Sequence, residues 1–442
     1  MTERPAIKRI AAEWALLPDG WHQNVLIEVD EHGLISSVSS SSSATSDQTL
    51  GVVIPGMINT HSHAFQRKLV GRTQRFTRPE DDFWSWRSQM YKQAELLTPD
   101  VQGALSLELF GDMLANGYTT VCEFQYAHGA VERTNAEIPA LMSSALIESG
   151  KAAGIRTLIL PVLYQQAGFA MRPSERHQRP FVLTTPVYLG LIDHLHEMYD
   201  DSDTVSIGYA PHSLRAVGYD ALMEMLDHRA TEHPGAAVHI HVSEQVREVN
   251  ECALATGRKP IEWLMQHANI DSSWCLIHAT HATDPELADI RGVGATVGLC
   301  PTTEADLGDG YFPFAAHVAA NGSFSIGSDS NVCVSPCEEL RLLDYQSRLA
   351  QRKRNALQFD SRSGTGTQLY QLALEGGRRA SCLPVGRIET GSFADIVSLS
   401  STHSLSRDRS PDEIMNAYVY SGGKDMIEHV LVGGQTPNAQ PL

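Results

Sequence analysis

The sequence predicts an α/β protein, a closed (β/α)8 TIM-type barrel with a small β-sandwich domain formed by both chain ends. Three observations lead to this fold class. Apolar runs of strand length alternate with longer amphipathic stretches, short strands separated by turn residues occupy both chain ends, and metal-competent side chains stand at the ends of several strand candidates. With 442 residues and 42% hydrophobic content, the chain can form such a barrel around a sizeable core.

Both ends of the chain have the sequence pattern of a small β-domain. Strand-like runs cover 7–16, 25–29 and 34–38, and turn sequences rich in Pro, Asp and Gly separate them. The same pattern of short strand-like runs returns after about residue 385. The simplest architecture brings both chain ends together in one small β-domain. We therefore predict a composite β-domain of residues 1–52 and 385–442 beside a metal-dependent catalytic barrel of residues 53–384.

The predicted barrel alternates strands with helices. After a first apolar run at 51–60, strand candidates follow at 117–124, 155–164, 205–214, 236–243, 274–280, 295–300 and 324–328. Amphipathic stretches lie between them, for example 100–116, 219–232, 246–255 and 337–354. This alternation predicts parallel pairing through crossover helices, and eight units fit a closed barrel. A doubly wound open sheet is the alternative, but no Gly-x-Gly-x-x-Gly turn follows the first strand.

The composition of the chain argues against some classes of binding partner. A formal net charge of −18 argues against nucleic acid, because phosphate binding needs a basic face. No apolar run approaches membrane-spanning length, and the N-terminus lacks the apolar core of a signal peptide. The seven cysteines form no Cys-x-x-Cys pair and are odd in number, which favours a reduced compartment. We predict a cytoplasmic protein with a small-molecule substrate and no membrane partner.

The first barrel strand leads into the pair His61-x-His63. Residues two apart on a strand point to the same side, so His61 and His63 would aim two imidazoles at one point. Neutral imidazole is the commonest metal ligand in proteins. The alternative for this pair alone is two histidines at a strand end without a metal.

Further metal-competent or titratable groups stand at three other strand ends. The fifth candidate carries His241 and, three residues on, Glu244; the sixth ends near His278 and the eighth near Asp329. Each alone could be a hydrogen-bonded core histidine or an Asp that caps a turn. Catalytic side chains of such barrels gather at the C-terminal strand ends, and burying many polar groups costs free energy unless they pair or bind something. Together these residues therefore predict a metal-dependent catalytic site.

This residue set is similar to that of the amidohydrolase superfamily, in its mononuclear-metal deaminase branch. Within that branch the sequence resembles the formimidoylglutamate deiminases. The similar stretches are 63–67, 82–87, 211–215 and 301–310, and the resemblance covers essentially the whole chain. It implies a hydrolase that acts on C–N bonds of linear amidines, and it implies a homodimer.

The resemblance implies one divalent metal ion held by His61, His63, His241 and Asp329. Nitrogen and carboxylate ligands make Zn²⁺ the first expectation, while Fe²⁺ and Mn²⁺ are also compatible. Binuclear relatives use a carboxylated lysine on a middle strand. No lysine occurs in the candidates 155–164 and 205–214, so one metal is expected.

The activity implied is hydrolysis of N-formimidoyl-L-glutamate to N-formyl-L-glutamate and ammonia, a step of histidine degradation. A metal-activated water would attack the formimino carbon. Glu244 would move protons to the substrate nitrogen and the leaving group, and His278 and Asp329 would assist the attack.

Recognition of this substrate requires groups for two carboxylates, and arginine binds carboxylates with fork geometry. Arg215, just past the fourth strand candidate, and Arg87 are the candidates, with Gln66, Tyr126 and His212 as further polar contacts. The alternative for an isolated arginine is a surface charge.

Two other functions remain open at this point. A ring deaminase of guanine or a related heterocycle would need stacking aromatics and amide contacts instead of two arginines. A non-catalytic scaffold on the same fold ranks lower, because such proteins typically lose metal ligands, and all four candidate positions are filled here.

Overall fold

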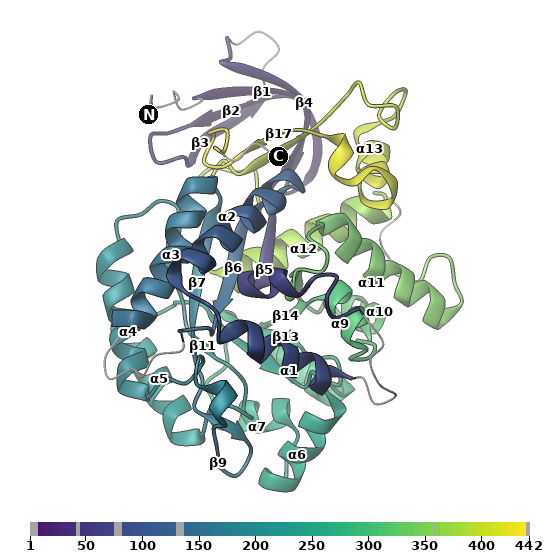
Figure 1. The fold of residues 1–442 in the computed structure, drawn as a ribbon. Coiled ribbons are helices and arrows are strands. Elements are labelled where there is room, and N and C mark those ends of the chain that lie inside the picture. Colours follow the sequence, from purple (N-terminus) through teal and green to yellow (C-terminus); the bar gives the residue numbers. More distant parts are fainter. Residues whose placement is uncertain are drawn as a thin grey trace.

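Two main β-sheets organise the chain in the computed structural model (Figure 1). It describes residues 8–40, 45–74, 82–129, 137–357, 359, 361 and 363–438. One sheet is a parallel barrel surrounded by helices, and the other is a smaller, mainly antiparallel sheet that contains strands from both chain ends. The predicted α/β barrel with a small terminal β-domain is confirmed.

The barrel has eight parallel strand positions. They are β5 (Met57–Ser62), β6 (Tyr118–Gln125), β7 (Arg156–Leu163), β10 (Val205–Ile207) with β11 (Ala210–Pro211), β12 (Val238–Val242), β13 (Trp274–His278), β14 (Thr296–Leu299) and β15 (Phe324–Ile326). β15 pairs with β5, and a parallel bridge between Tyr209 and Val238 joins the fourth position to β12. The ring is therefore closed, and the alternative of an open sheet is wrong.

The fourth strand differs from the predicted run 205–214, because β10 and β11 are separate short strands. The amide of Gly208 donates to Ile159 on β7, whereas the amide of Tyr209 donates to the carbonyl of Ala237 just before β12, both at 2.9 Å. The chain bends here to reach both neighbours, so closing the barrel interrupts the regular strand.

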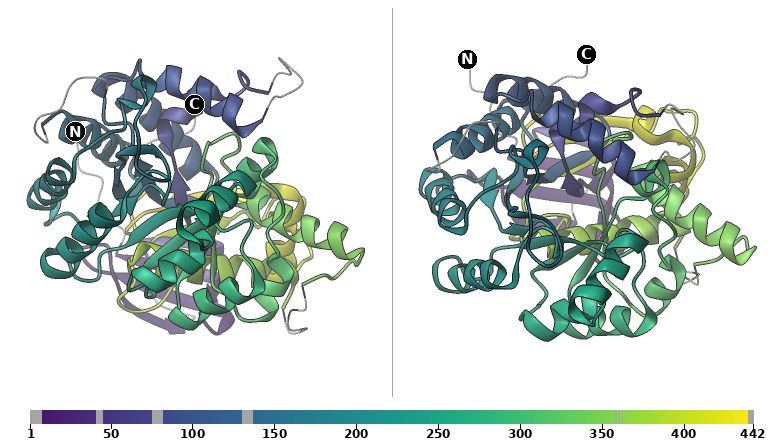
Figure 2. Two further views of the ribbon diagram at one scale, coloured as in Figure 1. Left: turned by 90° about the horizontal axis from the view of Figure 1, so that it is seen from below. Right: turned by 60° about the horizontal axis from the view of Figure 1, so that its bottom comes forward.

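Helices surround the barrel (Figure 2). They are α1 (Phe83–Ala94), α2 (Pro99–Ala115), α3 (Glu137–Ala153), α4 (Thr185–Tyr199), α5 (Tyr219–Glu232), α6 (Val246–Thr256), α7 (Pro260–His267), α8 (Asp284–Val293), α9 (Pro301–Leu307), α10 (Phe314–Ala319), α11 (Pro336–Gln351), α12 (Thr365–Ser381) and α13 (Pro411–Ala417). Several begin with proline, whose fixed φ and missing N–H suit the first helical turn. None of the helices in the described ranges is long and apolar enough to cross a bilayer.

The terminal sheet has six strands, in the spatial order β17–β16–β4–β1–β2–β3. They are β1 (Arg9–Leu17), β2 (Gly20–Val29), β3 (Ile35–Ser40), β4 (Gln48–Pro55), β16 (Ile396–Leu399) and β17 (Ile427–Leu431). The sheet has its own apolar cluster, which includes Ile27, Val53 and Ile396. We propose that it forms the composite domain of residues 1–52 and 385–442; β4 continues past residue 52 toward the barrel.

The two sheets are joined where β5 begins. Only Gly56 separates β4 from β5, and its amide donates to the carbonyl of Asp395 at 2.9 Å. Arg156 at the start of β7 forms a buried ion pair with Asp395 at 2.9 Å. The terminal sheet therefore anchors the N-terminal end of β5, and the histidines lie at the opposite end of that strand.

Candidate active site

His61 and His63 lie at the C-terminal end of β5 and are buried. The Nδ1 of His63 donates to the carbonyl of Phe124 at 2.9 Å, and on β12 the Nδ1 of His241 donates to the carbonyl of His212 at 3.0 Å. When such a ring is neutral, a bond of this kind places the proton on Nδ1 and leaves the lone pair on Nε2. The ladder of backbone carbonyls thus fixes the tautomer that a metal ligand needs.

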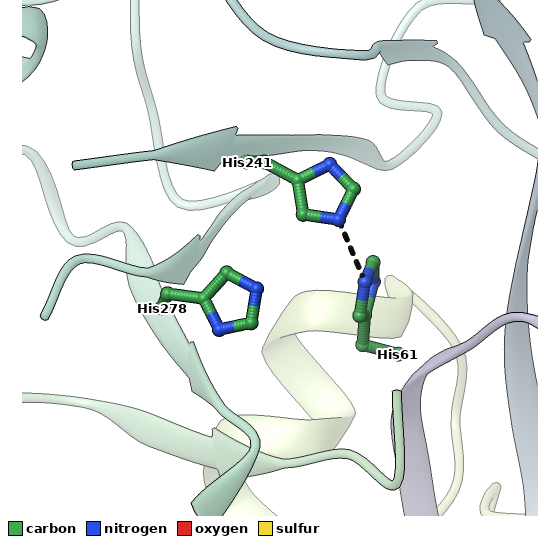
Figure 3. A group of neighbouring side chains, drawn as sticks. All are labelled: His61, His241 and His278. Carbon is green, nitrogen blue, oxygen red and sulfur yellow. Dashed lines mark hydrogen bonds between the residues drawn. The ribbon is translucent and has the colours of Figure 1, made fainter. Parts of the chain in front are cut away.

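The predicted ligands lie around His61 in two overlapping groups. The candidate ligand atoms of His61, His63 and Asp329 lie within 4.8 Å of one another, and so do those of His61, His241 and His278. The Nε2 atoms of His61 and His241 are 3.0 Å apart (Figure 3). The Oδ1 of Asp329 lies 3.2 Å from the Nε2 of His63 and 3.6 Å from the Nε2 of His61. Two ligand atoms bound to one tetrahedral ion are about 3.3 Å apart, so these spacings fit a shared cation.

Electrostatics also fits a cation. Burial and the neighbouring imidazoles lower the pKa values of His61 and His241 well below the usual range, so both rings are neutral near pH 7. Neutral rings with free lone pairs beside a carboxylate form a donor set that suits Zn²⁺ and other first-row divalent ions. The Nδ1 of His61 is buried without a hydrogen-bond partner. The residues present therefore fit one divalent metal.

Several residues at or next to these strand ends have a left-handed backbone. Ser243, His278 and Asp329 have positive φ values of 52°, 68° and 45°. Left-handed backbone is costly for non-glycine residues and persists where surrounding contacts enforce it. At Asp329 the amide donates to the carbonyl of His61 at 2.9 Å, and its carbonyl accepts from the amide of His63 at 3.0 Å. These two bonds hold the left-handed backbone of Asp329 and keep its carboxylate beside the histidines.

Close approach of β15 to β5 also requires a glycine. A Cβ on Gly327 would lie 2.8 Å from the backbone nitrogen of His61. Any larger residue would push the Asp329 strand end away from the histidines.

Glu244 and His278 lie beside the ligand cluster. The Nε2 of His278 is 3.9 Å from the Oε1 of Glu244 and 3.9 Å from the Oδ2 of Asp329. Burial raises the pKa of Glu244 above its usual range. Burial would lower the pKa of His278, but Glu244, Glu304 and Asp329 together raise it to about 10. These groups can exchange protons within a buried site.

Two carboxylates that sequence reasoning did not assign support this pair. The Nδ1 of His278 lies 3.2 Å from the Oε1 of Glu304, which also accepts from the amide of Cys300 at 2.9 Å. The Oε2 of Glu248 accepts from the amide of Glu244 at 3.0 Å. Glu304 stands in the first turn of the helix that follows a strand end, and that position was the available signal.

His239, two residues before His241, does not belong to the ligand cluster. Its Nε2 donates to the carbonyl of Ala380 at 2.8 Å, which ties β12 to the C-terminal turn of α12. It supports the barrel interior below the ligand cluster.

A pocket opens above the cluster. Its walls are His63, Gln66, Phe83, Trp86, Arg87, Met90, Tyr126, His212, Arg215, His241, Glu244, His278, Leu307 and Asp329. The predicted substrate residues Gln66, Arg87, Tyr126, His212 and Arg215 are all among them. Helix α1 supplies Phe83, Trp86, Arg87 and Met90, so this helix forms one wall of the pocket.

The polar pocket residues are arranged around two buried arginines. The exposed fraction of the residue is 9% for Arg87 and 3% for Arg215. Arg87 donates to the hydroxyl of Tyr164 at 3.0 Å, whereas the Nε and Nη1 of Arg215 have no hydrogen-bond partner. Neither arginine forms an ion pair with any residue of the described ranges. Burial and both arginines lower the pKa of His212, so this ring is neutral.

Amide and phenol groups lie beside the pocket arginines. Gln66 donates to the hydroxyl of Tyr126 at 2.7 Å, and Gln178 donates to the hydroxyl of Tyr164 at 2.6 Å. The Oε1 of Gln66 remains unpaired. Tyr164 and Gln178 were missed by sequence reasoning, although Tyr164 ends a predicted strand and could have been included on that ground.

Comparison with known proteins agrees with this site. Residues 52–436 match the model of the amidohydrolase family. The chain belongs to the amidohydrolase family. Members of this family depend on metal ions, in agreement with the histidine cluster of this amidohydrolase.

Three relatives illustrate the similarity. Formimidoylglutamate deiminase of Pseudomonas aeruginosa is 39% identical over 427 residues, which are 96% of this chain and 93% of that protein. The crystal structure of an amidohydrolase from Brucella melitensis has a TM-score of 0.89 and 38% identity, covering 97% of this chain and 94% of that one. An adenosine deaminase from Xanthomonas campestris with bound zinc shares the fold, with a TM-score of 0.79, 20% identity and coverage of 98% and 93%.

Proposed function

We propose that this amidohydrolase hydrolyses N-formimidoyl-L-glutamate to N-formyl-L-glutamate and ammonia. The 39% identity to the P. aeruginosa formimidoylglutamate deiminase over nearly the full chain supports this substrate. The observation that carries the proposal is the pair of buried arginines, Arg87 and Arg215, which face the same pocket as the ligand cluster and have no carboxylate partner among the residues that the structure describes. A substrate with two carboxylates would neutralise both.

His61, His63, His241 and Asp329 would hold one divalent ion, with Zn²⁺ as the first choice and Fe²⁺ or Mn²⁺ compatible with the same donors. When bound, such an ion supplies a Lewis acid that lowers the pKa of a water toward about 7. The zinc found with the X. campestris relative is in line with this choice.

The chain's own groups would carry the protons. The Oδ2 of Asp329 accepts the proton of the attacking water, and the imidazole of His278 orients the attacking oxygen. Glu244 gives its carboxyl proton to the imino nitrogen, then takes the proton of the newly added hydroxyl group and passes it to the same nitrogen, so that the C–N bond breaks, the C=O bond forms and ammonia leaves. The proton held by Asp329 then returns to Glu244 and restores both carboxyl groups. The formyl carbonyl remains on the glutamate nitrogen. The raised pKa of Glu244 suits a group that must start protonated.

Arg87 and Arg215 would bind the two carboxylates of the substrate and place the formimidoyl group over the ligand cluster. Gln66, Tyr126 and His212 would supply the remaining polar contacts from the same wall. Because the arginines are buried, each would contribute more than an exposed charge pair does.

A panel of substrates tests the proposal. Metal-loaded protein is assayed for ammonia release from formimidoylglutamate, formimidoylaspartate, guanine and cytosine, with the metal content measured in parallel. We expect turnover of formimidoylglutamate and none of the rings, since a neutral heterocycle leaves both arginines unpaired. Turnover of guanine alone would replace the proposal with a ring deaminase, and no turnover of any substrate by metal-loaded protein would favour a scaffold. The homodimer and the cytoplasmic location stay predictions.

A further inference from the structure

Trp84 contacts three arginines, and the proposed reaction gives it no role. The guanidinium carbons of Arg87, Arg215 and Arg247 lie 5.4, 5.6 and 4.4 Å from the centre of the Trp84 ring. All three distances fall within the range of a cation–π contact, and indole is the strongest aromatic partner for a cation. Trp84 is absent from the pocket walls, so its effect on a ligand would pass through the arginines.

An indole next to Arg87 and Arg215 stabilises their buried positive charges. They are buried like charges without an ion-pair partner among the residues described, and only Arg87 has a hydrogen bond to a neutral group, the hydroxyl of Tyr164. The negative face of an indole offsets part of the positive charge without neutralising it. A carboxylate in the same place would satisfy the guanidiniums in advance and would exclude the substrate.

The position of Trp84 is itself fixed. The side chain of Asp82 caps α1 and accepts from the amides of Trp84 and Ser85, both at 3.0 Å. Arg87 follows one helical turn later and therefore lies on the same face of α1 as Trp84. Arg247 of α6 also contacts the indole and forms an ion pair with Glu251 at 2.7 Å. The indole thus connects α1 with α6 as well as with Arg215.

We infer that Trp84 is a positioning residue that holds Arg87 and Arg215 at the spacing needed for a substrate with two carboxylates. Arg247 steadies the indole from α6. The inference rests on the proposed function, because it assumes that both arginines bind carboxylates of one substrate. It makes Trp84 a determinant of specificity for dicarboxylates over monocarboxylates.

The test compares Trp84→Leu and Trp84→Phe on formimidoylglutamate and on N-formimidoylglycine, which has one carboxylate. We expect Trp84→Leu to raise KM for formimidoylglutamate about tenfold, with kcat changed less than about twofold. The effect on N-formimidoylglycine should stay below about threefold, and Trp84→Phe should recover most of the loss. Arg247→Gln should raise KM for formimidoylglutamate two- to threefold, since it removes one contact to the indole.

Trp263→Leu on α7 is the matched control, because it removes an indole outside the pocket and should leave both KM values unchanged. Equal losses on both substrates, a loss confined to kcat, or an unchanged KM in Trp84→Leu would overturn the inference.

Glutarate binding to the metal-loaded protein, measured by calorimetry, separates this inference from the proposed function. If the wild-type protein fails to turn over formimidoylglutamate, the proposed function is wrong. Weaker glutarate binding in Trp84→Leu would then still support the positioning role, and unchanged binding would reject it.

Discussion

The two sides of the pocket are built in different ways. The proposed chemical groups stand at the ends of β5, β12, β13 and β15, where backbone bonds between neighbouring strands hold each residue. Among the proposed recognition groups, Arg87 stands on α1 and is held by the hydroxyl of Tyr164, while Gln66 and Tyr126 are held by the bond between their side chains. Backbone hydrogen bonds of the barrel therefore position the chemical groups. Substrate specificity depends on side-chain contacts that a single substitution can change.

Asp329 and Arg87 illustrate the difference. Both the amide and the carbonyl of Asp329 are bonded to β5, so its carboxylate can hardly move without opening the barrel. Arg87 is positioned by the hydroxyl of Tyr164 and the rings of Trp84 and Tyr91. We expect substitutions on the chemical side to abolish turnover and substitutions on the recognition side to alter affinity.

The largest expected effect is on the chemical side. Asp329→Asn keeps the shape of the side chain but removes the charge that faces His61 and His63. We expect kcat to fall about 10³-fold or more and the metal content to drop, because a ligand and a proton acceptor are lost together. Ammonia release and elemental analysis measure the two effects, with exposed Asp289→Asn as control. Full activity in Asp329→Asn would contradict the proposed role.

The recognition side should respond in KM. Arg87→Met and Arg215→Met each remove a buried charge from the pocket, and we expect KM for formimidoylglutamate to rise about 100-fold in each with the metal content unchanged. Steady-state kinetics measure the change, and exposed Arg407→Met serves as control. If turnover of formimidoylglutamate survives both substitutions unchanged, the acyclic dicarboxylate proposal is wrong.

A smaller effect on kcat is expected for a substitution of Glu304, which contacts the Nδ1 of His278. Glu304→Gln retains an acceptor for the amide of Cys300 but removes the charge beside the Nδ1 of His278. We expect kcat to fall about tenfold and KM to stay within about twofold, since the imidazole would be oriented less firmly. A pH profile of kcat distinguishes this role from a structural one. An unchanged profile with lower thermal stability would mean that Glu304 serves only folding.

The smallest effect concerns stability. Glu339 accepts from the amide and hydroxyl of Thr302, which lies on the same helix as Glu304, and burial raises the pKa of Glu339 to about 8. An unfolded glutamate titrates near about 4.3, so the folded state retains a proton that the unfolded state releases. This contribution to stability is present below about pH 4 and is lost as the pH rises toward about 8.

Glu339→Gln removes the titration but keeps the size of the side chain. We expect its free energy of unfolding, relative to the wild type, to increase by more than about 1 kcal/mol between pH 5 and pH 8. Calorimetric unfolding at several pH values measures the difference. A constant difference across this range would show that Glu339 is ionised in the folded protein.

Much of the chemical side could be predicted from the sequence. The period of a strand places His61 and His63 on one side, and the rule that parallel strands end at one edge brings in His241, His278 and Asp329. Amphipathic spacing predicted α5 at its observed bounds, 219–232. These features depend on local geometry, which the order of residues determines.

The recognition side could be predicted only in part, through the resemblance. The bond from Arg87 to Tyr164 joins residues 77 positions apart and depends on how α1 lies against the barrel. The contact between His278 and Glu304 likewise crosses from β13 to α9. No periodicity encodes such distances. The interruption between β10 and β11 was missed for the same reason, because closure of the ring produces it.

The junction at Gly56 has a practical consequence. The terminal sheet lies at one end of the barrel (Figure 1). Since β4 of this sheet runs directly into β5, the pocket residue His63 lies just past the opposite end of β5, remote from the terminal sheet. A surface coating, resin or reporter protein coupled through the terminal sheet would face away from the substrate entrance. Immobilised in that orientation, the catalyst would keep its entrance open to the bulk liquid.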